Sequence, residues 1–477
     1  MLRKEILDNH NWGVVLPAIV SKEETQSVQL KTPPGPPVQF FIGSAREALR
    51  NPLAFNLKYW KQYGDYLKFH ALPGMTWYMF TDPSAVEHIL QTHQQKYQKP
   101  SRFKDSFGLL GGKGLLTSDG DYWLKQRRLI QPAFHRERMM ELGSLMTQSI
   151  EEQIADWEER DANAVVDVFQ EMMTLTLKVV GRTLFGAELG DQAERFREAL
   201  DLATAHIADQ VSSIISFPTW VPTSKNRHFC RNKAILDDMV YGIIEHRRAT
   251  THETGDLLDM LMNVSDADSG SAMSNDQLRD EVITLLISGH ETLAISLSWC
   301  FYLLAQNPVQ ESVLLDELSS VLGGRAATMA DLPRLPYNKM VFEEALRLYP
   351  PIWGQPREAR EDDAINGYAV PKGATVSVCQ FITHRHPLYW QNPQQFMPER
   401  FMPEVEAQRP KFAYYPFGGG GRTCIANNMA MIEGQLALAT IAQRLKFELV
   451  PGHLVEPDPK CTLRPKYGIK AHMQRRS

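Results

Sequence analysis

The chain has 477 residues, of which 43% are hydrophobic and 22% charged, and its 51 basic and 56 acidic residues give a formal charge of −5. This composition excludes a disordered or collagen-like chain and argues against a nucleic-acid-binding protein with a broad basic surface. The five cysteines are scattered and form no CxxC pair, which disfavours a disulfide framework or structural zinc site and favours a reducing compartment, the cytoplasm.

The first 31 residues are predicted to be a loosely packed leader. Their one apolar stretch, residues 12–20, contains Pro17. It is far shorter than the roughly 20 apolar residues that span a bilayer, so we expect no integral membrane anchor. No small-residue cleavage site accompanies it, which disfavours a secretory signal. Residues 32–477 are expected to form one domain, because no repeat or composition break divides them.

The first predicted elements lie between residues 65 and 303. Residues 65–80 alternate around Pro73 and Gly74, which predicts a β-hairpin. From residue 122 to 303 most segments show helical periodicity. Downstream, the pattern predicts a helix over 337–349, β-type segments within 364–377, a proline-rich meander over 391–410 and a last helix over 425–444.

A long apolar helix is predicted over residues 276–306. It follows a polar loop, residues 264–275, and opens with a capping box made by Ser274 and Gln277. A helix so long and so apolar cannot lie on a surface, so we expect it to cross the centre of the protein.

The most informative segment is residues 417–426, FGGGGRTCIA. Four glycines allow backbone turns that other residues resist and let a flat group approach closely. A helix is predicted to begin directly after Cys424, and its N-terminus, together with the Arg422 cation, is expected to favour the thiolate. Cys424 is therefore a candidate thiolate ligand or nucleophile.

Three other interpretations of this segment stay open on the residues alone. Cys424 can be a buried structural cysteine that follows a flexible loop. A phosphate-binding loop requires a Gly-Lys-Ser/Thr ending, which Gly421-Arg422-Thr423 only imitates. A nucleophilic cysteine requires a partner base, and no local pattern supplies one.

Residues 417–426 resemble the haem-thiolate signature of the cytochrome P450 monooxygenases. Ala426 stands where the family usually has glycine; the added methyl group is expected to shift the packing of the sulfur without abolishing ligation. The resemblance implies that Cys424 is the axial ligand of the haem iron. The positions that match the signature or stand in it, all expected at the haem, are Phe417, Gly420, Arg422, Cys424 and Ala426.

Two further segments resemble family motifs in the expected order. Glu344-Ala345-Leu346-Arg347 resembles the E-x-x-R motif, and residues 396–401, FMPERF, resemble the meander motif. The resemblance implies a buried triad of Glu344, Arg347 and Arg400. Its role is expected to be structural, because loss of one member leaves an unpaired buried charge.

The predicted central helix contains Ser288-Gly289-His290-Glu291-Thr292, which resembles the acid–alcohol motif of the family. The resemblance implies that Glu291 and Thr292 deliver protons to O2. Gly289 is expected to let the helix approach the flat cofactor, and the Thr292 hydroxyl to bond to the Ser288 carbonyl. His290 is expected to face away from the iron.

Four residues are expected to bind the haem propionates. Trp123-x-x-x-Arg127 resembles a family pattern and places an indole N–H and a guanidinium one helical turn apart. Arg357 stands where many relatives have a propionate-binding arginine, and Arg422 adds a further cation. Arg128 is expected to face solvent.

The resemblance runs from Pro33 to about Lys466 and implies a mainly α-helical P450 fold with a smaller β-rich lobe. Haem b is expected between the central helix and the Cys424 loop. Only 53 residues follow Cys424, which leaves no room for a fused reductase. We therefore expect two electrons per turnover, drawn from NAD(P)H, to come through a ferredoxin or flavodoxin that docks near Lys125 and Arg128. A bacterial source is expected.

The implied activity is insertion of one oxygen atom of O2 into a C–H bond or double bond of a lipophilic molecule, such as a fatty acid or a terpenoid. The residues expected to line the pocket are mostly apolar, and none is charged. They are Phe107, Leu109 and Leu110 in an expected loop before Trp123, together with Leu285, Ser288, Ile352, Trp353, Cys461 and Thr462.

Two rival functions remain at this point. One is a haem-thiolate isomerase or peroxygenase that needs no reductase. The other is a non-enzymatic haem protein that sequesters a lipophile or senses a gas. The Glu291–Thr292 pair argues against both, because neither function needs a path for protons.

Overall fold

The computed structural model describes residues 30–37, 45–72, 75–161, 164–185, 192–213, 217–249, 255–264 and 272–476. The apolar stretch at 12–20 and most of the predicted leader lie outside these residues. Lys31 is among the described residues and is hydrogen-bonded to the rest of the fold. The Lys31 N–H donates to the Gly367 carbonyl, and the Lys31 carbonyl accepts from the Ala369 N–H, both at 2.9 Å. Packing in the described part therefore includes a residue that we assigned to the leader.

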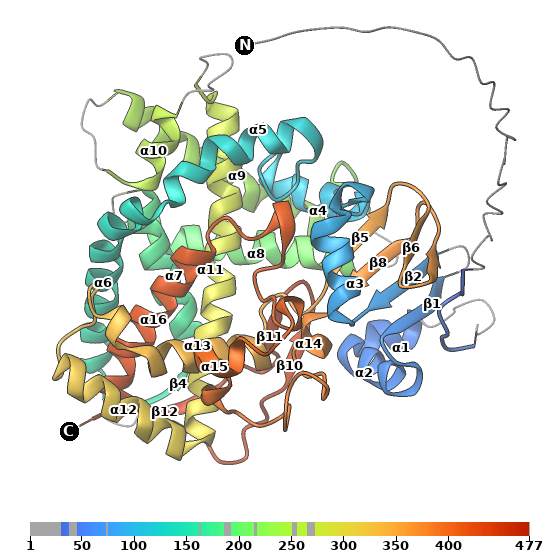
Figure 1. Ribbon diagram of the computed structural model, residues 1–477. Coiled ribbons are helices and arrows are strands. Elements are labelled where there is room, and N and C mark those ends of the chain that lie inside the picture. Colours follow the sequence, from blue (N-terminus) through green and yellow to red (C-terminus); the bar gives the residue numbers. More distant parts are fainter. Residues whose placement is uncertain are drawn as a thin grey trace, which may run out of the picture.

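The predicted architecture, mainly helical with a smaller β-rich lobe, is confirmed (Figure 1). The helices form the larger part of the molecule, and the sheet lies at one side of it. The helices not detailed below are α1 Ala45–Arg50, α2 Pro52–Tyr63, α3 Pro83–Glu87, α9 Ser224–Ala249, α10 Leu257–Asn263, α12 Pro308–Leu322, α14 Gln380–Thr383 and α15 Pro403–Glu406.

The sheet of the β-rich lobe has five strands in the order β1-β2-β8-β5-β3. Strands β1 (Tyr66–Leu72) and β2 (Met75–Phe80) are antiparallel and confirm the predicted hairpin, whose Pro73-Gly74 turn lies outside the described residues. Strand β2 pairs in parallel with β8 (Thr375–Val378), which continues to β5 (Gln355–Ala359) and β3 (Tyr97–Gln98). Alternate side chains of these strands point into an apolar cluster. They include Tyr78, Phe80, Val376 and Val378.

The remaining strands are short. Strand β4 (Ala164–Asp167) interrupts the mostly helical stretch and joins β12 (Lys470–Arg475) and β9 (Leu445–Leu449) in a three-stranded sheet. Strands β10 (Pro457–Pro459) and β11 (Leu463–Pro465) form a hairpin. The segment predicted to be β-type contains most of β6 (Asp363–Ile365), all of β7 (Tyr368–Val370) and most of β8.

Helix α11 (Asn275–Gln306) is the predicted central helix, and it passes through the middle of the helical part (Figure 1). Its capping box forms as expected, since the Ser274 hydroxyl accepts from the Gln277 N–H while the Gln277 side chain accepts from the Ser274 N–H. By length and hydropathy α11 is a candidate membrane span, but 72% of its most apolar 18-residue window is buried inside the protein. It is a core helix.

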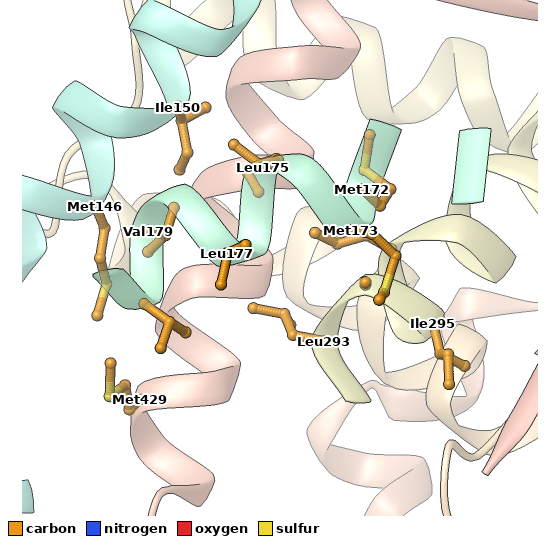
Figure 2. Packing of buried hydrophobic residues seen from close by; sticks show 14 of the residues in the cluster. Met146, Ile150, Met172, Met173, Leu175, Leu177, Val179, Leu293, Ile295 and Met429 are labelled. Carbon is orange, nitrogen blue, oxygen red and sulfur yellow. The ribbon is translucent and has the colours of Figure 1, made fainter. Parts of the chain in front are cut away.

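Helices α7 (Val168–Phe185) and α16 (Asn427–Arg444) pack against α11, and α6 (Arg136–Glu158) packs against both α7 and α16. Figure 2 shows their side chains meeting between the ribbons. Unbranched methionines fill irregular gaps beside branched aliphatic residues. This core therefore excludes water and supports the candidate site described below. The labelled residues are Met146, Ile150, Met172, Met173, Leu175, Leu177, Val179, Leu293, Ile295 and Met429.

Candidate active site

One cavity of about 1840 Å³ lies between α11, the Cys424 loop, the β10–β11 hairpin and helix α8 (Ala193–Ser212). Most of the predicted pocket residues line it, namely Phe107, Leu285, Ser288, Ile352, Trp353, Cys461 and Thr462.

Leu109 and Leu110 do not line this cavity, so that part of the prediction is wrong. The segment is a helix, α4 (Ser101–Gly111), and not the loop that we expected. Phe103 and Phe107, four residues apart on one face of α4, line the cavity. Leu109, two residues from Phe107, lies on another face, and Leu110 is fully buried in the core.

The Cys424 side chain faces the cavity, and its position is set by the loop before it. The Cys424 N–H donates to the Phe417 carbonyl at 2.9 Å, which closes the loop. Phe417 and Ala426 line the cavity beside the thiol. This wall presents one sulfur atom among apolar groups.

The prediction about the thiol's environment is wrong in two respects. Helix α16 begins only at Asn427, and Arg422 turns away to pair with Asp119. Burial raises the pKa of the Cys424 thiol, and the Ala426 N–H and the Arg127 cation oppose this effect only in part. The thiol therefore has no depressed pKa of its own, and its deprotonation would have to accompany binding of a metal.

The glycines of this loop serve a protein contact. Gly420 has a φ of +64°, and a Cβ atom there would lie 1.9 Å from the Leu90 carbonyl oxygen. A Cβ on Gly419 would lie 2.4 Å from the Phe412 ring. The loop thus needs glycine to pack against its own protein neighbours, whereas we expected the glycines to admit a flat cofactor.

Two basic side chains, Arg357 and Lys99, line the cavity near Arg422. Arg357 donates to the Pro356 carbonyl and to Gln355 Oε1, and its pKa falls to about 10 because of burial and the nearby Arg422. Lys99, which the sequence analysis missed, donates to the Leu116 carbonyl; burial and the cations Arg422 and Arg357 lower its pKa well below the ordinary value. Neither Arg357 nor Lys99 forms an ion pair with a described carboxylate.

Helix α5 (Gly120–Ile130) contributes the other residues expected at the propionates. Trp123 and Arg127 both line the cavity, and Arg127 donates to the Thr423 carbonyl at 2.7 Å. The Arg422 guanidinium carbon lies 3.8 Å from the centre of the Trp123 ring. Arg128 is exposed, as predicted.

The predicted triad of Glu344, Arg347 and Arg400 forms in the core behind the Cys424 loop. Arg347 Nε donates to Glu344 Oε2 at 2.6 Å, and Arg400 Nε donates to Glu344 Oε1 at 3.3 Å. Glu344 and Arg347 have no exposed surface, and Arg400 is 6% exposed. Helix α13 (Pro336–Leu348), which contains the first two residues, is thereby joined to the turn η6 (Pro398–Phe401).

On the opposite wall, α11 carries a polar notch. The Thr292 hydroxyl donates to the Ser288 carbonyl at 2.6 Å, as predicted, and Gly289 also lines the cavity. His290 is directed elsewhere: its ring bonds to the Met173 carbonyl at 2.9 Å, and burial lowers its pKa to about 4. A neutral His290 directed at α7 agrees with the expectation that it faces away from the iron.

Glu291 has partners that the sequence analysis did not anticipate. Arg464 Nε donates to Glu291 Oε1 at 2.6 Å, and the Thr462 hydroxyl donates to the same oxygen. Burial raises the pKa of the Glu291 carboxyl, but Arg464 and Thr462 outweigh burial and hold that pKa below its ordinary value.

This arrangement fits a haem. Cys424 presents a sulfur ligand, apolar side chains surround it, and Arg357 and Lys99, which line the cavity, can receive the two propionates. Two basic side chains that line the cavity and form no ion pair with a described carboxylate fit a dianionic group better than an uncharged one.

Comparisons with known proteins agree with this geometry. The family model described as "Cytochrome P450" matches residues 33–472. Cyclooctatin synthase of Streptomyces melanosporofaciens is 34% identical over 88% of this chain and 91% of that protein. Pentalenene oxygenase of Streptomyces avermitilis is 30% identical over 88% of this chain and 92% of that protein.

A solved structure gives the same result. The crystal structure of the cytochrome P450DA haem domain superimposes with a TM-score of 0.86 at 27% identity, and the match covers 94% of this chain and 98% of that one. Motifs, fold and relatives agree over nearly the whole length: this chain belongs to the cytochrome P450 family of monooxygenases.

Proposed function

We propose that this P450 inserts one oxygen atom of O2 into a C–H bond or double bond of a lipophilic molecule of the terpenoid class. The observation that carries the proposal is the large cavity between Cys424 and Thr292, with apolar side chains such as Leu285 and Ile352 in its walls. Such a cavity suits a bulky hydrocarbon skeleton. Cyclooctatin synthase and pentalenene oxygenase support the substrate class by their names.

The haem b that the family implies is held by this chain's own side chains. Cys424 binds the iron, and Arg357 and Lys99, with Arg127 and Trp123 nearby, bind the propionates by charge-assisted hydrogen bonds. When bound, the haem supplies the activation of O2 and the storage of electrons. The protein supplies orientation, an apolar enclosure and protons.

Proton delivery falls to the notch in α11. The Thr292 hydroxyl, held by the Ser288 carbonyl, presents its oxygen to the cavity as a proton relay. Glu291, the residue before it, is the carboxylate that takes up protons from solvent and passes them to this relay. Gly289 keeps a side chain out of the space beside the notch.

Two electrons come from a separate ferredoxin or flavodoxin in the cytoplasm, reduced at the expense of NAD(P)H. Its docking site is the exposed side of α5 near the Cys424 loop, where Lys125 and Arg128 are exposed cations. Acidic electron carriers are steered to such a face by charge.

The experiment has two steps. The reduced, carbon-monoxide-bound protein is expected to give the absorbance of a thiolate-ligated haem. Pentalenene is then supplied with NADPH, ferredoxin and ferredoxin reductase under isotopically labelled O2, and a product with one labelled oxygen atom is expected. Equal turnover with hydrogen peroxide alone would favour the peroxygenase, and absence of NADPH consumption with any bound ligand would favour the non-enzymatic haem protein.

A further inference from the structure

The Glu291 carboxylate is bound by the β10–β11 hairpin, far along the chain. Its Oε1 accepts from both Arg464 and Thr462, and their side chains lie in the wall of the cavity. Only 12% of the Glu291 side chain and 31% of the Arg464 side chain are exposed. The ion pair is therefore largely withdrawn from bulk water, where its charges interact more strongly than on a surface.

The hairpin that carries Arg464 is fixed to the core. Trp299, one of the largest fully buried side chains, donates its indole N–H to the Leu463 carbonyl at 2.8 Å. The Leu463 N–H donates to the Pro351 carbonyl at 2.9 Å. Because Trp299 and Glu291 both lie on α11, the same helix holds the acid and the strand that supplies its partner.

Other titratable groups lie close to the pair of Glu291 and Arg464. Asp201 on α8 accepts a hydrogen bond from Arg197 at 3.0 Å and also interacts electrostatically with Arg464. His290, buried and with a pKa of about 4, is neutral at physiological pH. The Cys461 thiol, whose pKa burial raises to about 12, is also neutral. Arg464 is thus the one cation that forms a hydrogen bond with Glu291 among the described residues.

Two other carboxyls show what burial does without such a partner. Glu433, buried in α16 with no hydrogen bond to its Oε1, has its pKa raised to about 8 by burial. Glu281, buried in α11 and bonded to the Leu115 N–H, has its pKa raised to about 7 by burial. Glu291 is comparably buried, yet its pKa lies below the ordinary value. Its difference from the other two is the contact with Arg464 and Thr462.

We propose that Arg464 is a positioning residue that keeps Glu291 ionised and oriented next to Thr292, and so makes the β10–β11 hairpin part of the proton-delivery machinery. This role rests on the proposed function, since it concerns the carboxylate that passes protons to Thr292. The hairpin also lines the cavity with Pro457, Lys460 and Cys461. The β10–β11 hairpin therefore both lines the cavity and holds the Glu291 carboxylate.

The test is the ionisation state of Glu291, measured by infrared spectroscopy of the haem-loaded protein without substrate. In Arg464→Gln we expect one protonated-carboxyl band at neutral pH in addition to those that wild type shows from carboxyls such as Glu433. The band is expected to vanish in the double variant Glu291→Gln/Arg464→Gln, which assigns it to Glu291. Arg464→Lys restores a cation and is expected to suppress the band.

Arg475→Gln is the matched control, because it removes an exposed arginine from β12, away from the cavity, and is expected to leave the spectrum unchanged. Arg464→Leu, which removes the charge and keeps the volume, replaces Arg464→Gln if that variant does not fold. A Glu291 that stays ionised in the folded, charge-free variant overturns the role of Arg464. The readout uses no substrate, so this failure is distinct from failure of the carbon-monoxide spectrum or of turnover, which would overturn the proposed function.

Discussion

The two walls of the cavity are built on different principles. On the Cys424 wall the charges satisfy one another inside the protein: Glu344, Arg347 and Arg400 form a closed, buried triad behind the ligand loop. On the α11 wall the charged pair Glu291 and Arg464 opens onto the cavity itself. The first wall fixes where the cofactor lies, and the second supplies chemistry that a ligand in the cavity can influence. Disruption of the first wall should lower the folding stability or the haem content. Disruption of the second wall should lower the amount of product formed per NADPH consumed.

The largest effect is expected at the ligand of the first wall. Cys424→Ser replaces the thiol with an alcohol that does not form an anion at neutral pH, so the thiolate-type carbon-monoxide spectrum and turnover should both be lost completely. Absorbance spectra of the purified variant decide the point. Cys461→Ser, which changes another cysteine in the cavity lining, is the control and should keep the spectrum. An unchanged spectrum in Cys424→Ser would refute the ligand assignment.

The triad comes next. Glu344→Gln leaves Arg347 and Arg400 buried without an anion, and breaking a buried ion pair from one side costs about 3–5 kcal/mol in the free energy of unfolding. Urea denaturation of the haem-loaded protein measures the loss. Lys339→Gln removes the exposed end of a pair on the same helix and should cost at most about 1 kcal/mol. Equal losses in the two variants would contradict the buried triad.

The glycine loop allows a finer comparison. Gly420→Ala must accommodate both a positive φ and a Cβ that would lie 1.9 Å from the Leu90 carbonyl, so backbone strain of about 1–3 kcal/mol and a shifted loop are expected. Gly323, at the end of α12, has a similar φ of +59° but open space around its Cβ position. Gly323→Ala should therefore cost less in melting temperature and leave the haem spectrum unaltered. A larger loss at Gly323 would contradict the close-contact argument.

Much of the first wall could be predicted from the sequence, because its motifs combine short-range spacing with residue types that have few alternatives. The E-x-x-R pair shares a helical face, and the Gly-rich run before Cys424 identifies a constrained loop. The second wall was predicted only in part. Ser288 and Thr292 are four residues apart on one helix, so their hydrogen bond is a local property. Lys99 and Arg464 reach the cavity through tertiary packing across the chain, and no local pattern marks either one.

The pocket residues show the same limit from another side. Phe107 was predicted correctly and Leu109 wrongly, although both are apolar and only two residues apart. Composition indicated a buried, lipophilic environment for both, but only the helical state of α4 decides which side chain faces the cavity and which the core. A loop and a helix expose different subsets of the same sequence, so an error in local structure becomes an error in the site.

The smallest expected effect tests the second wall directly. Thr292→Ala removes the relay hydroxyl while leaving the Ser288 carbonyl in place, so product formed per NADPH consumed should fall about tenfold, with electrons diverted to hydrogen peroxide. Ser298→Ala is the matched control: its hydroxyl makes the same bond to a carbonyl four residues back, at 2.6 Å to Ala294, but faces the core. Both variants should melt within a few degrees of wild type, since each loses one intrahelical hydroxyl bond. If Thr292→Ala forms as much product per NADPH as Ser298→Ala does, the notch in α11 delivers no proton. The second wall then has a structural role only, as the first has.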